Sequence, residues 1–169
     1  MPARRLRPRP TALSEIRLLV LDVDGVLTDG RLRYGPQGES EKLFHVRDGY
    51  GIKTVLAAGI AVAVISGRNS QAVARRCEEL GIRHVRQGIE DKASALQELF
   101  ATLGLHARQC ACVGDDEPDV PLMRQAGFAV AVADAHPTAT AIAHRRTRLP
   151  GGAGAVREVC DWLLAARRR

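Results

Sequence analysis

Aromatic side chains are scarce in this chain of 169 residues: one Trp, two Tyr and three Phe make up 4% of it. Proteins that bind nucleic acids by stacking interleave aromatic residues with a basic stripe, and here the Trp and the two Tyr are scattered. The chain also lacks any apolar run near the ~20 residues that a membrane-spanning helix needs, so we expect no transmembrane segment. No apolar stretch with a small-residue cleavage site follows the charged first residues, so we expect no secretory signal.

Cysteine is limited to four residues, and these do not form a metal-ligand pattern. Cys110 and Cys112 would point to the same side of one strand, but no third and fourth ligands lie nearby in the sequence. Cys77 and Cys160 stand alone. We interpret all four as small apolar core residues of a protein in a reducing compartment, which predicts a cytoplasmic location.

The formal net charge of +6 describes the ends of the chain rather than its body. Seven of the 25 basic residues are arginines in the first ten residues and at 167–169, and the rest of the chain holds 18 basic and 19 acidic residues. We therefore predict no specific nucleic-acid binding. Residues 1–15 are rich in Pro and Arg and lack periodicity, which predicts a disordered leader before a single domain at 16–169.

Short apolar runs alternate with amphipathic stretches, which predicts a doubly wound, Rossmann-like α/β domain with a parallel sheet. The runs are apolar throughout, as is typical of strands covered on both faces; they are 18–21, 60–65, 111–113 and 128–132, with a weaker one at 84–87. Capping residues and terminal glycines predict helices that start at Asp48 and span 71–80 and 92–103.

Residues 28–46 break the alternation of strands and helices. Two short runs, 31–34 and 42–46, flank a Gly/Pro turn at 35–38, which predicts a β-hairpin after the first strand. This position is the edge at which open α/β sheets bind their ligands. Apolar hairpin residues would be exposed in a monomer, which favours an oligomer; a flap folded back on its own domain is the alternative.

Asp22 and Asp24 directly follow the first predicted strand, and Gly25 permits a sharp turn after them. Two carboxylates so close together repel each other unless a hard cation neutralises them, so the pair indicates a Mg²⁺ site. Acidic residues also occur in such loops by chance, so this pair alone does not establish a site.

Other polar groups follow the remaining strands. Ser66, Gly67 and Arg68 offer a hydroxyl, backbone amides and a guanidinium to an anion. Lys92 opens a helix whose N-terminus is already positive, which indicates an anionic partner; a solvated surface lysine is the alternative. Residues 115–119 crowd four carboxylates together, which is costly without a cation. The set suits phosphoryl transfer through a carboxylate nucleophile assisted by a metal.

Four segments, in order along residues 17–132, resemble the motifs of the haloacid dehalogenase superfamily of phosphatases: DVDGVLTDG, ISGR, EDKAS and GDDEPD. The hairpin stands where other members of the superfamily carry a cap domain. Three features narrow the resemblance to the capless phosphatases of 3-deoxy-D-manno-octulosonate (KDO) 8-phosphate: the DGVLTDG extension of the first motif and the segments at 44–52 and 151–164. The resemblance implies Mg²⁺-dependent hydrolysis of this keto-acid sugar phosphate in lipopolysaccharide precursor synthesis.

The resemblance also implies roles for the residues that match the motifs. Asp22 would be the nucleophile that forms an aspartyl-phosphate, and Asp24 the general acid and base. Mg²⁺ would be bound by the Asp22 carboxylate, the Asp24 backbone carbonyl and the Asp115 carboxylate.

Ser66 and Lys92 would bind phosphoryl oxygens, while Asp116 and Asp119 would support the metal site and Lys92. Asp119 is also expected to cap the helix that follows it.

The substrate's carboxylate calls for a second cationic anchor, for which Arg47, Arg68 and Arg157 are candidates. The resemblance implies a homotetramer in which hairpins associate and the C-terminal segment, 150–169, reaches a neighbouring site. From the sequence alone, the glycines at 151, 152 and 154 indicate either a flexible tail or a loop that initiates a helix.

Two other functions fit part of the pattern. A phosphatase of another acid sugar, such as a nonulosonate 9-phosphate, would carry the same core motifs. A non-enzymatic phospho-receiver also gathers acidic residues, a hydroxyl and a lysine at strand ends. Asp24 argues against a receiver because it supplies an acid/base group that a stable aspartyl-phosphate switch lacks.

Overall fold

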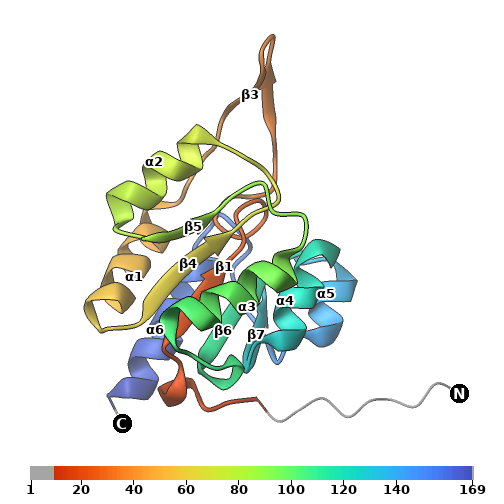
Figure 1. Cartoon of the computed structure of the whole chain (residues 1–169). Helices are drawn as coiled ribbons and strands as arrows, with labels where there is room; N and C mark the ends of the chain where they lie inside the picture. Colours follow the sequence, from red (N-terminus) through yellow and green to blue (C-terminus); the bar gives the residue numbers. More distant parts are fainter. Residues whose placement is uncertain (1–9, 169) are drawn as a thin grey trace, which may run out of the picture.

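A parallel sheet of six strands, in the order β5-β4-β1-β6-β7-β8, forms the centre of a computed structural model of the chain (Figure 1). The structure describes residues 10–168; residues 1–9 and Arg169, which include most of the predicted leader, lie outside the described residues. The strands are β1 (Leu18–Leu21), β4 (Ala61–Ile65), β5 (His84–Arg86), β6 (Cys110–Gly114), β7 (Phe128–Ala131) and β8 (Arg145–Arg146).

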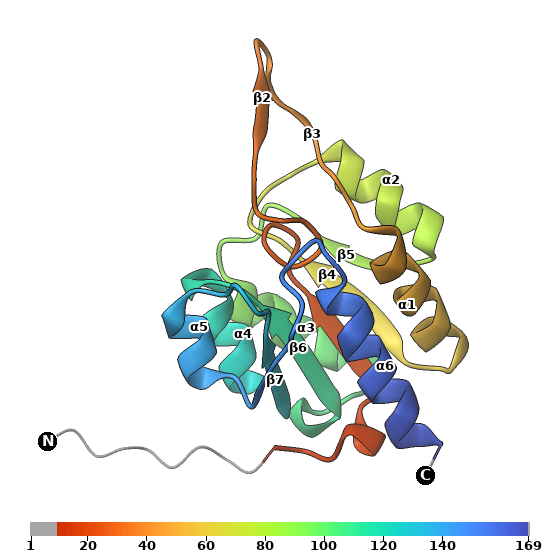
Figure 2. The same ribbon diagram turned by 180° about the vertical axis from the view of Figure 1, so that it is seen from behind.

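Helices cover both faces of the sheet, as Figures 1 and 2 show from opposite sides. One face carries α1 (Val46–Ala57), α2 (Gln71–Leu80) and α6 (Ala155–Arg167). The other carries α3 (Lys92–Leu103), α4 (Val120–Gln125) and α5 (Pro137–Ile142). Short 3₁₀ turns lie at Leu13–Glu15, Ala107–Gln109 and Glu117–Asp119.

Alternate strand residues build two separate cores. In β1, Leu19 and Leu21 pack on the α1, α2 and α6 side, whereas Leu18 and Val20 pack on the α3, α4 and α5 side. Because both faces are buried, the strand is apolar throughout rather than alternating. These observations confirm the predicted doubly wound parallel α/β fold with a hairpin after the first strand. No helix among residues 10–168 has the length and apolar character to cross a membrane.

The ends of two predicted helices are confirmed, and the start of a third is wrong. Helices α2 and α3 end at Gly81 and Gly104, both with positive φ, as predicted. Helix α1 begins at Val46 with His45 as its N-cap, not at Asp48. The Asp48 carboxylate instead accepts the backbone N–H of Arg157 at 2.9 Å and so caps α6. A capping residue in the sequence does not reveal which helix it caps.

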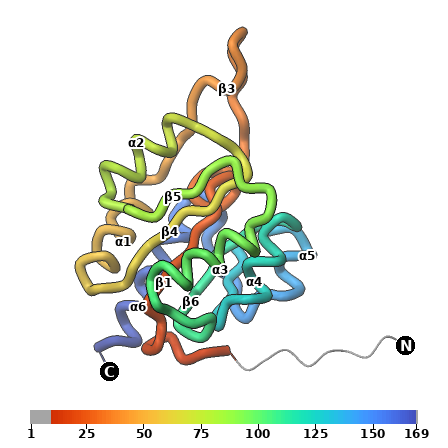
Figure 3. The backbone as a smooth tube through the Cα atoms, in the orientation of Figure 1, coloured from red at the N-terminus to blue at the C-terminus, as the bar shows by residue number. Residues whose placement is uncertain are grey.

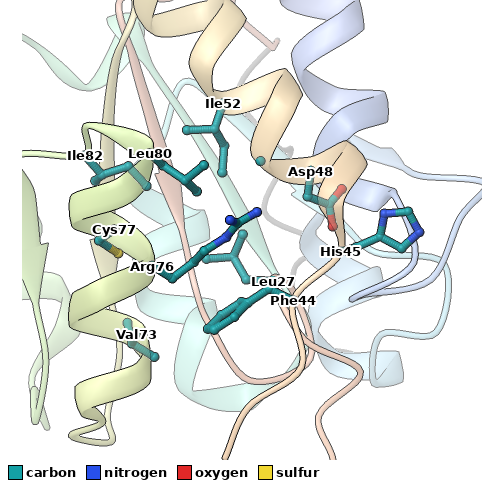
Figure 4. Close-up of a pocket in the computed structure, with 11 residues that line it drawn as sticks. Leu27, Phe44, His45, Asp48, Ile52, Val73, Arg76, Cys77, Leu80 and Ile82 are labelled. Carbon is teal, nitrogen blue, oxygen red and sulfur yellow. The ribbon is translucent and has the colours of Figure 1, made fainter.

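The hairpin consists of β2 (Arg33–Gly35) and β3 (Gly38–Glu41), which pair in antiparallel fashion. It projects beyond the edge of the sheet (Figure 3). The second strand was predicted at 42–46, which is too late by four residues. Residues 42–45 instead connect β3 to α1, and Phe44 lines a small apolar pocket together with Leu27, Val73 and Leu80 (Figure 4).

Part of the predicted disordered leader is ordered. Thr11 is buried, and its N–H donates to the carbonyl of Gly127 at 2.9 Å. The turn at Leu13–Glu15 follows, and Leu13 packs against the core. In the described part of the predicted leader, residues 10–15, a backbone bond from Thr11 and the packing of Leu13 thus join the segment to the domain.

The C-terminal segment is a core element rather than a flexible tail. Five apolar residues of α6 are buried against the sheet and α1: Ala155, Val156, Val159, Cys160 and Leu163. The preceding loop packs closely on the loop after β1, where a Cβ at Gly151 would lie 1.8 Å from the carbonyl oxygen of Gly25. Of the two interpretations of these glycines, the loop that initiates a helix is the observed one.

Candidate active site

Three neighbouring strands bring the predicted site residues to one edge of the sheet. Leu21 at the end of β1 pairs with Val64 of β4 on one side and with Val113 of β6 on the other. The residues just beyond these positions are Asp22, Ser66 and Asp115, and the Asp22 N–H donates to the Val113 carbonyl at 3.3 Å. The ends of parallel strands thus gather groups that lie far apart in the sequence.

Lys92 is buried at the centre of this edge. Its Nζ lies 2.7 Å from Asp22 Oδ1 and 2.7 Å from Asp119 Oδ1, and its side chain is 6% exposed. Burial by itself lowers the pKa of Lys92, but the charges of Asp22 and Asp119 outweigh it and raise the pKa above its usual value. Lys92 is therefore a charged member of the site, and the alternative of a solvated surface lysine is excluded.

Asp22, Asp115 and Asp119 form a cluster in which one oxygen of each lies within 4.8 Å of the others. Both carboxylate oxygens of Asp119 are hydrogen-bonded. Oδ1 accepts from Lys92, and Oδ2 accepts the N–H groups of Asp115 and Asp116. Asp119 occupies the N-cap position of α4, as predicted, but its side chain makes no capping bond to that helix. Asp116 instead accepts the N–H of Glu117 and caps the short turn.

The three carboxylates of this cluster share one ammonium, that of Lys92, and the pKa values of two of them are raised. Burial, with the charge of Asp119 added, raises the pKa of Asp22 to about 7. Burial, with the charges of Asp22 and Asp119 added, raises the pKa of Asp115 to about 8. Hard oxygen donors with unbalanced negative charge fit Mg²⁺, and a bound divalent cation would allow both groups to ionise.

The loop after β1 is shaped to bring its backbone against this cluster. Gly25 has φ +92°, and a Cβ there would lie 1.9 Å from Asp115 Oδ2, so only glycine fits. Thr28 is buried, and its hydroxyl accepts the N–H groups of Gly25 at 3.3 Å and Gly30 at 3.2 Å. The Thr28 hydroxyl therefore closes the turn that positions Asp22 and Asp24.

Ser66 follows β4 and is buried. Its hydroxyl accepts the backbone N–H of Arg68 at 3.4 Å, and its carbonyl accepts the N–H of Ile89 at 3.0 Å. These bonds fix a hydroxyl and the turn after it at the same edge as Asp22.

The hairpin of the same chain reaches this site, through residues that sequence reasoning missed. Lys42 Nζ lies 2.6 Å from Asp24 Oδ1 and 2.9 Å from Glu39 Oε1. Arg68 is bound to Glu39 at 2.9 Å and to the Tyr34 hydroxyl at 3.0 Å. Lys42 and Glu39 gave no signal in the sequence, because alternating charges are common in exposed hairpins.

The three candidate arginines differ in position. Arg68 Nε lies 3.8 Å from Asp24 Oδ2, so this residue is at the site. Arg157 pairs with Asp161 at 2.9 Å and lies over the Tyr50 ring at 5.0 Å. Arg47 is exposed in the first turn of α1. Within the described chain, Arg68 is thus the only one of the three with a contact to the carboxylates of the site.

Comparison with known proteins gives consistent matches. Residues 85–150 match the haloacid dehalogenase-like hydrolase family. The chain is 51% identical over 154 residues to the KDO 8-phosphate phosphatase of Yersinia pestis, which covers 91% of this chain and 82% of the relative. The Escherichia coli K12 phosphatase is 51% identical over 152 residues, covering 90% and 81%.

Solved structures of the same kind superimpose closely. The crystal structure of the Yersinia pestis phosphatase has a TM-score of 0.91 at 50% identity and covers 93% of this chain and 85% of that one. The phosphatase of Moraxella catarrhalis, in complex with a magnesium ion, a phosphate ion and KDO, has a TM-score of 0.90 at 42% identity and covers 93% and 90%.

Proposed function

Because this chain belongs to the KDO 8-phosphate phosphatase family of the haloacid dehalogenase superfamily, we propose that it hydrolyses KDO 8-phosphate to KDO and phosphate with Mg²⁺. The observation that carries the proposal is the arrangement of Asp22, which shares the ammonium of Lys92 with Asp119 at the edge of the sheet. A buried nucleophile beside a fixed cation is what attack on a phosphate dianion requires.

The reaction proceeds in two steps. A carboxylate oxygen of Asp22 forms a bond to phosphorus while the bond to the sugar oxygen breaks, and Asp24 gives its proton to that oxygen. Asp24 then takes a proton from water as the water oxygen attacks phosphorus, which releases inorganic phosphate and restores Asp22.

The surrounding residues offset charge and orient the phosphoryl group. Lys92 and the Ser66 hydroxyl bind phosphoryl oxygens and hold phosphorus in line with Asp22. Asp22, Asp115 and the Asp24 carbonyl would hold Mg²⁺, which would supply positive charge that stabilises the negative charge of the transferring group. Asp119 and Asp116 keep the Asp115 loop and Lys92 in place.

Arg68 is the arginine best placed to bind the carboxylate of the sugar acid. Its side chain is 42% exposed and lies beside Asp24, so it is accessible to a ligand. Arg47 and Arg157 have no such position within this chain, and a neighbouring subunit would be needed for them to act.

The assembly that fits these observations is a homotetramer in which hairpins associate. Leu32, Tyr34 and Leu43 of the hairpin region are 41%, 62% and 69% exposed, which is costly for a free subunit in water. The four cysteines are buried free thiols, which supports a reducing, cytoplasmic location.

The test is phosphate release from a panel of substrates: KDO 8-phosphate, a nonulosonate 9-phosphate, ribose 5-phosphate and an aryl phosphate, each with Mg²⁺ or with EDTA. We expect kcat/KM for KDO 8-phosphate to exceed that of the other sugar phosphates by at least about 10-fold, and EDTA to abolish turnover. A higher kcat/KM for the nonulosonate would transfer the proposal to that substrate. No turnover of any phosphomonoester would refute it.

A further inference from the structure

Lys42 is a part-buried residue whose ammonium is covered by two acidic side chains. Its side chain is 2% exposed, although it stands at the base of a hairpin that projects above the sheet (Figure 2). Nζ is bound to Asp24 Oδ1 at 2.6 Å and to Glu39 Oε1 at 2.9 Å. A buried ammonium is costly unless it is paired, so this arrangement holds Lys42 in one position.

The contact with Asp24 distinguishes the two oxygens of that carboxyl group. Oδ1 accepts from Lys42, whereas among the hydrogen bonds of the described residues none reaches Oδ2. The nearest cation to Oδ2 is Arg68 Nε at 3.8 Å, beyond hydrogen-bond distance. One oxygen is therefore fixed and the other remains open to a reactant.

We propose that Lys42 is a positioning residue that fixes the Asp24 side chain so that Oδ2 handles the proton of the leaving group and of the attacking water. This rests on the proposed function, because it assumes that Asp24 is the acid and base. Lys42 does not need to contact the substrate. Its effect is on orientation, and misplacing a reacting group by ~1 Å costs about 100-fold in rate.

The experiment compares Lys42→Met with Lys42→Arg and with the unaltered enzyme. In Lys42→Met, kcat for KDO 8-phosphate should fall about 10- to 100-fold with KM nearly unchanged. In single-turnover phosphorylation by an aryl phosphate, whose leaving group needs no proton, the loss should stay below about 5-fold. Lys42→Arg keeps the charge and should recover part of kcat.

Two further variants separate positioning of Asp24 from anchoring of the hairpin. Glu39→Gln removes the partner that Lys42 shares with Arg68 but leaves the Lys42–Asp24 pair, so it should lose less kcat than Lys42→Met. Arg33→Met breaks the exposed pair with Glu41 at 2.8 Å and serves as the matched hairpin control, with kcat unchanged. If Lys42→Met does not fold, Lys42→Gln replaces it.

Three outcomes would overturn the proposal: an equal loss for the sugar and aryl phosphates, a change confined to KM, or a loss in Glu39→Gln as large as in Lys42→Met. The proposed function can fail separately. If the enzyme prefers another sugar phosphate, that substrate replaces KDO 8-phosphate in the experiment. The loss of activity of Lys42→Met with that substrate, relative to its loss with the aryl phosphate, then tests the role of Lys42.

Discussion

At the scale of single residues, Asp22 is held by the ammonium of Lys92 at 2.7 Å and by its own backbone bond to β6. We predict that Asp22→Asn lowers turnover at least about 10³-fold, since an amide cannot form the phosphoryl bond. The fold should persist, because Asn has nearly the same shape and Lys92 keeps Asp119. Phosphate release and thermal melting measure the two effects. Substantial residual activity with unchanged Mg²⁺ dependence would remove Asp22 from the role of nucleophile.

Asp24 has a different chemical task, so the loss of activity when it is replaced should depend on the leaving group. Asp24→Asn should reduce turnover of KDO 8-phosphate about 10²- to 10⁴-fold, because proton transfer to the sugar oxygen is lost. The loss in single-turnover phosphorylation should be much smaller for an aryl phosphate. Rapid quenching of the first turnover measures both. Equal losses for alkyl and aryl substrates would count against general acid catalysis.

Asp22 and Asp115 should make the stability of the metal-free protein depend on pH. Their pKa values are about 7 and about 8 in the folded protein, against an ordinary 3.8, so the folded state binds more protons between these values. The free energy of unfolding should therefore fall as the pH rises from about 5 to 8. Urea unfolding in EDTA measures this decrease, and Asp115→Asn should reduce it.

Mg²⁺ should reverse this dependence, because the ion takes the place of the protons. We expect Mg²⁺ to raise the melting temperature more at about pH 8 than at about pH 5.5. If Mg²⁺ raised the melting temperature equally at both pH values, its binding would not be linked to the ionisation of these carboxyl groups.

At the scale of elements, α1 and α6 are joined by a buried carboxyl group. Asp48 is 2% exposed; Oδ1 caps α6 through Arg157 N–H, and Oδ2 has no hydrogen-bond partner within the described chain. Asp48→Ala should lower the free energy of unfolding by about 1–2 kcal/mol, as expected for loss of an N-cap. Asp161→Ala, which breaks only an exposed pair on α6, is the control and should change stability by less than about 0.5 kcal/mol. Urea denaturation compares them, and equal effects would argue against a capping role.

The hairpin shows how an element can be predicted in kind and missed in position. The Gly/Pro turn identified it, but the charged segment Gly38–Glu41 forms its second strand rather than the alternating run 42–46 that follows. In that strand Glu39 pairs with Lys42 and Arg68, and Phe44 packs at the root of the hairpin. Tertiary contacts therefore outweighed the preference of the alternating run for a strand.

At the scale of the whole molecule, we predict a tetramer whose formation depends on the apolar hairpin residues. Leu43→Asp should shift the protein to smaller species, because a charge would replace an exposed Leu at the expected contact. Ala101→Asp, at an exposed position of α3, is the matched control and should leave the assembly unchanged. Light scattering after size-exclusion chromatography measures the mass. An unaltered mass for Leu43→Asp would exclude this residue from the interface.

Within the described chain, the sequence by itself determined five of the six strands of the sheet, three of the six α-helices and four residues of the candidate site. Buried parallel strands must be apolar on both faces, and their ends converge, so Asp22, Ser66, Lys92 and Asp115 could be placed together from spacing alone. Local signals were sufficient for these four residues because each lies just after a strand or at the start of a helix.

Tertiary structure alone decided the contacts between distant segments. No local pattern indicates that Asp48 caps a helix 109 positions away, that Thr11 bonds to Gly127, or that Lys42 binds Asp24. Each of these contacts depends on which surfaces the packed helices and the hairpin bring together. A single polar side chain in the sequence does not specify its partners, whereas the fold decides which groups lie within its reach.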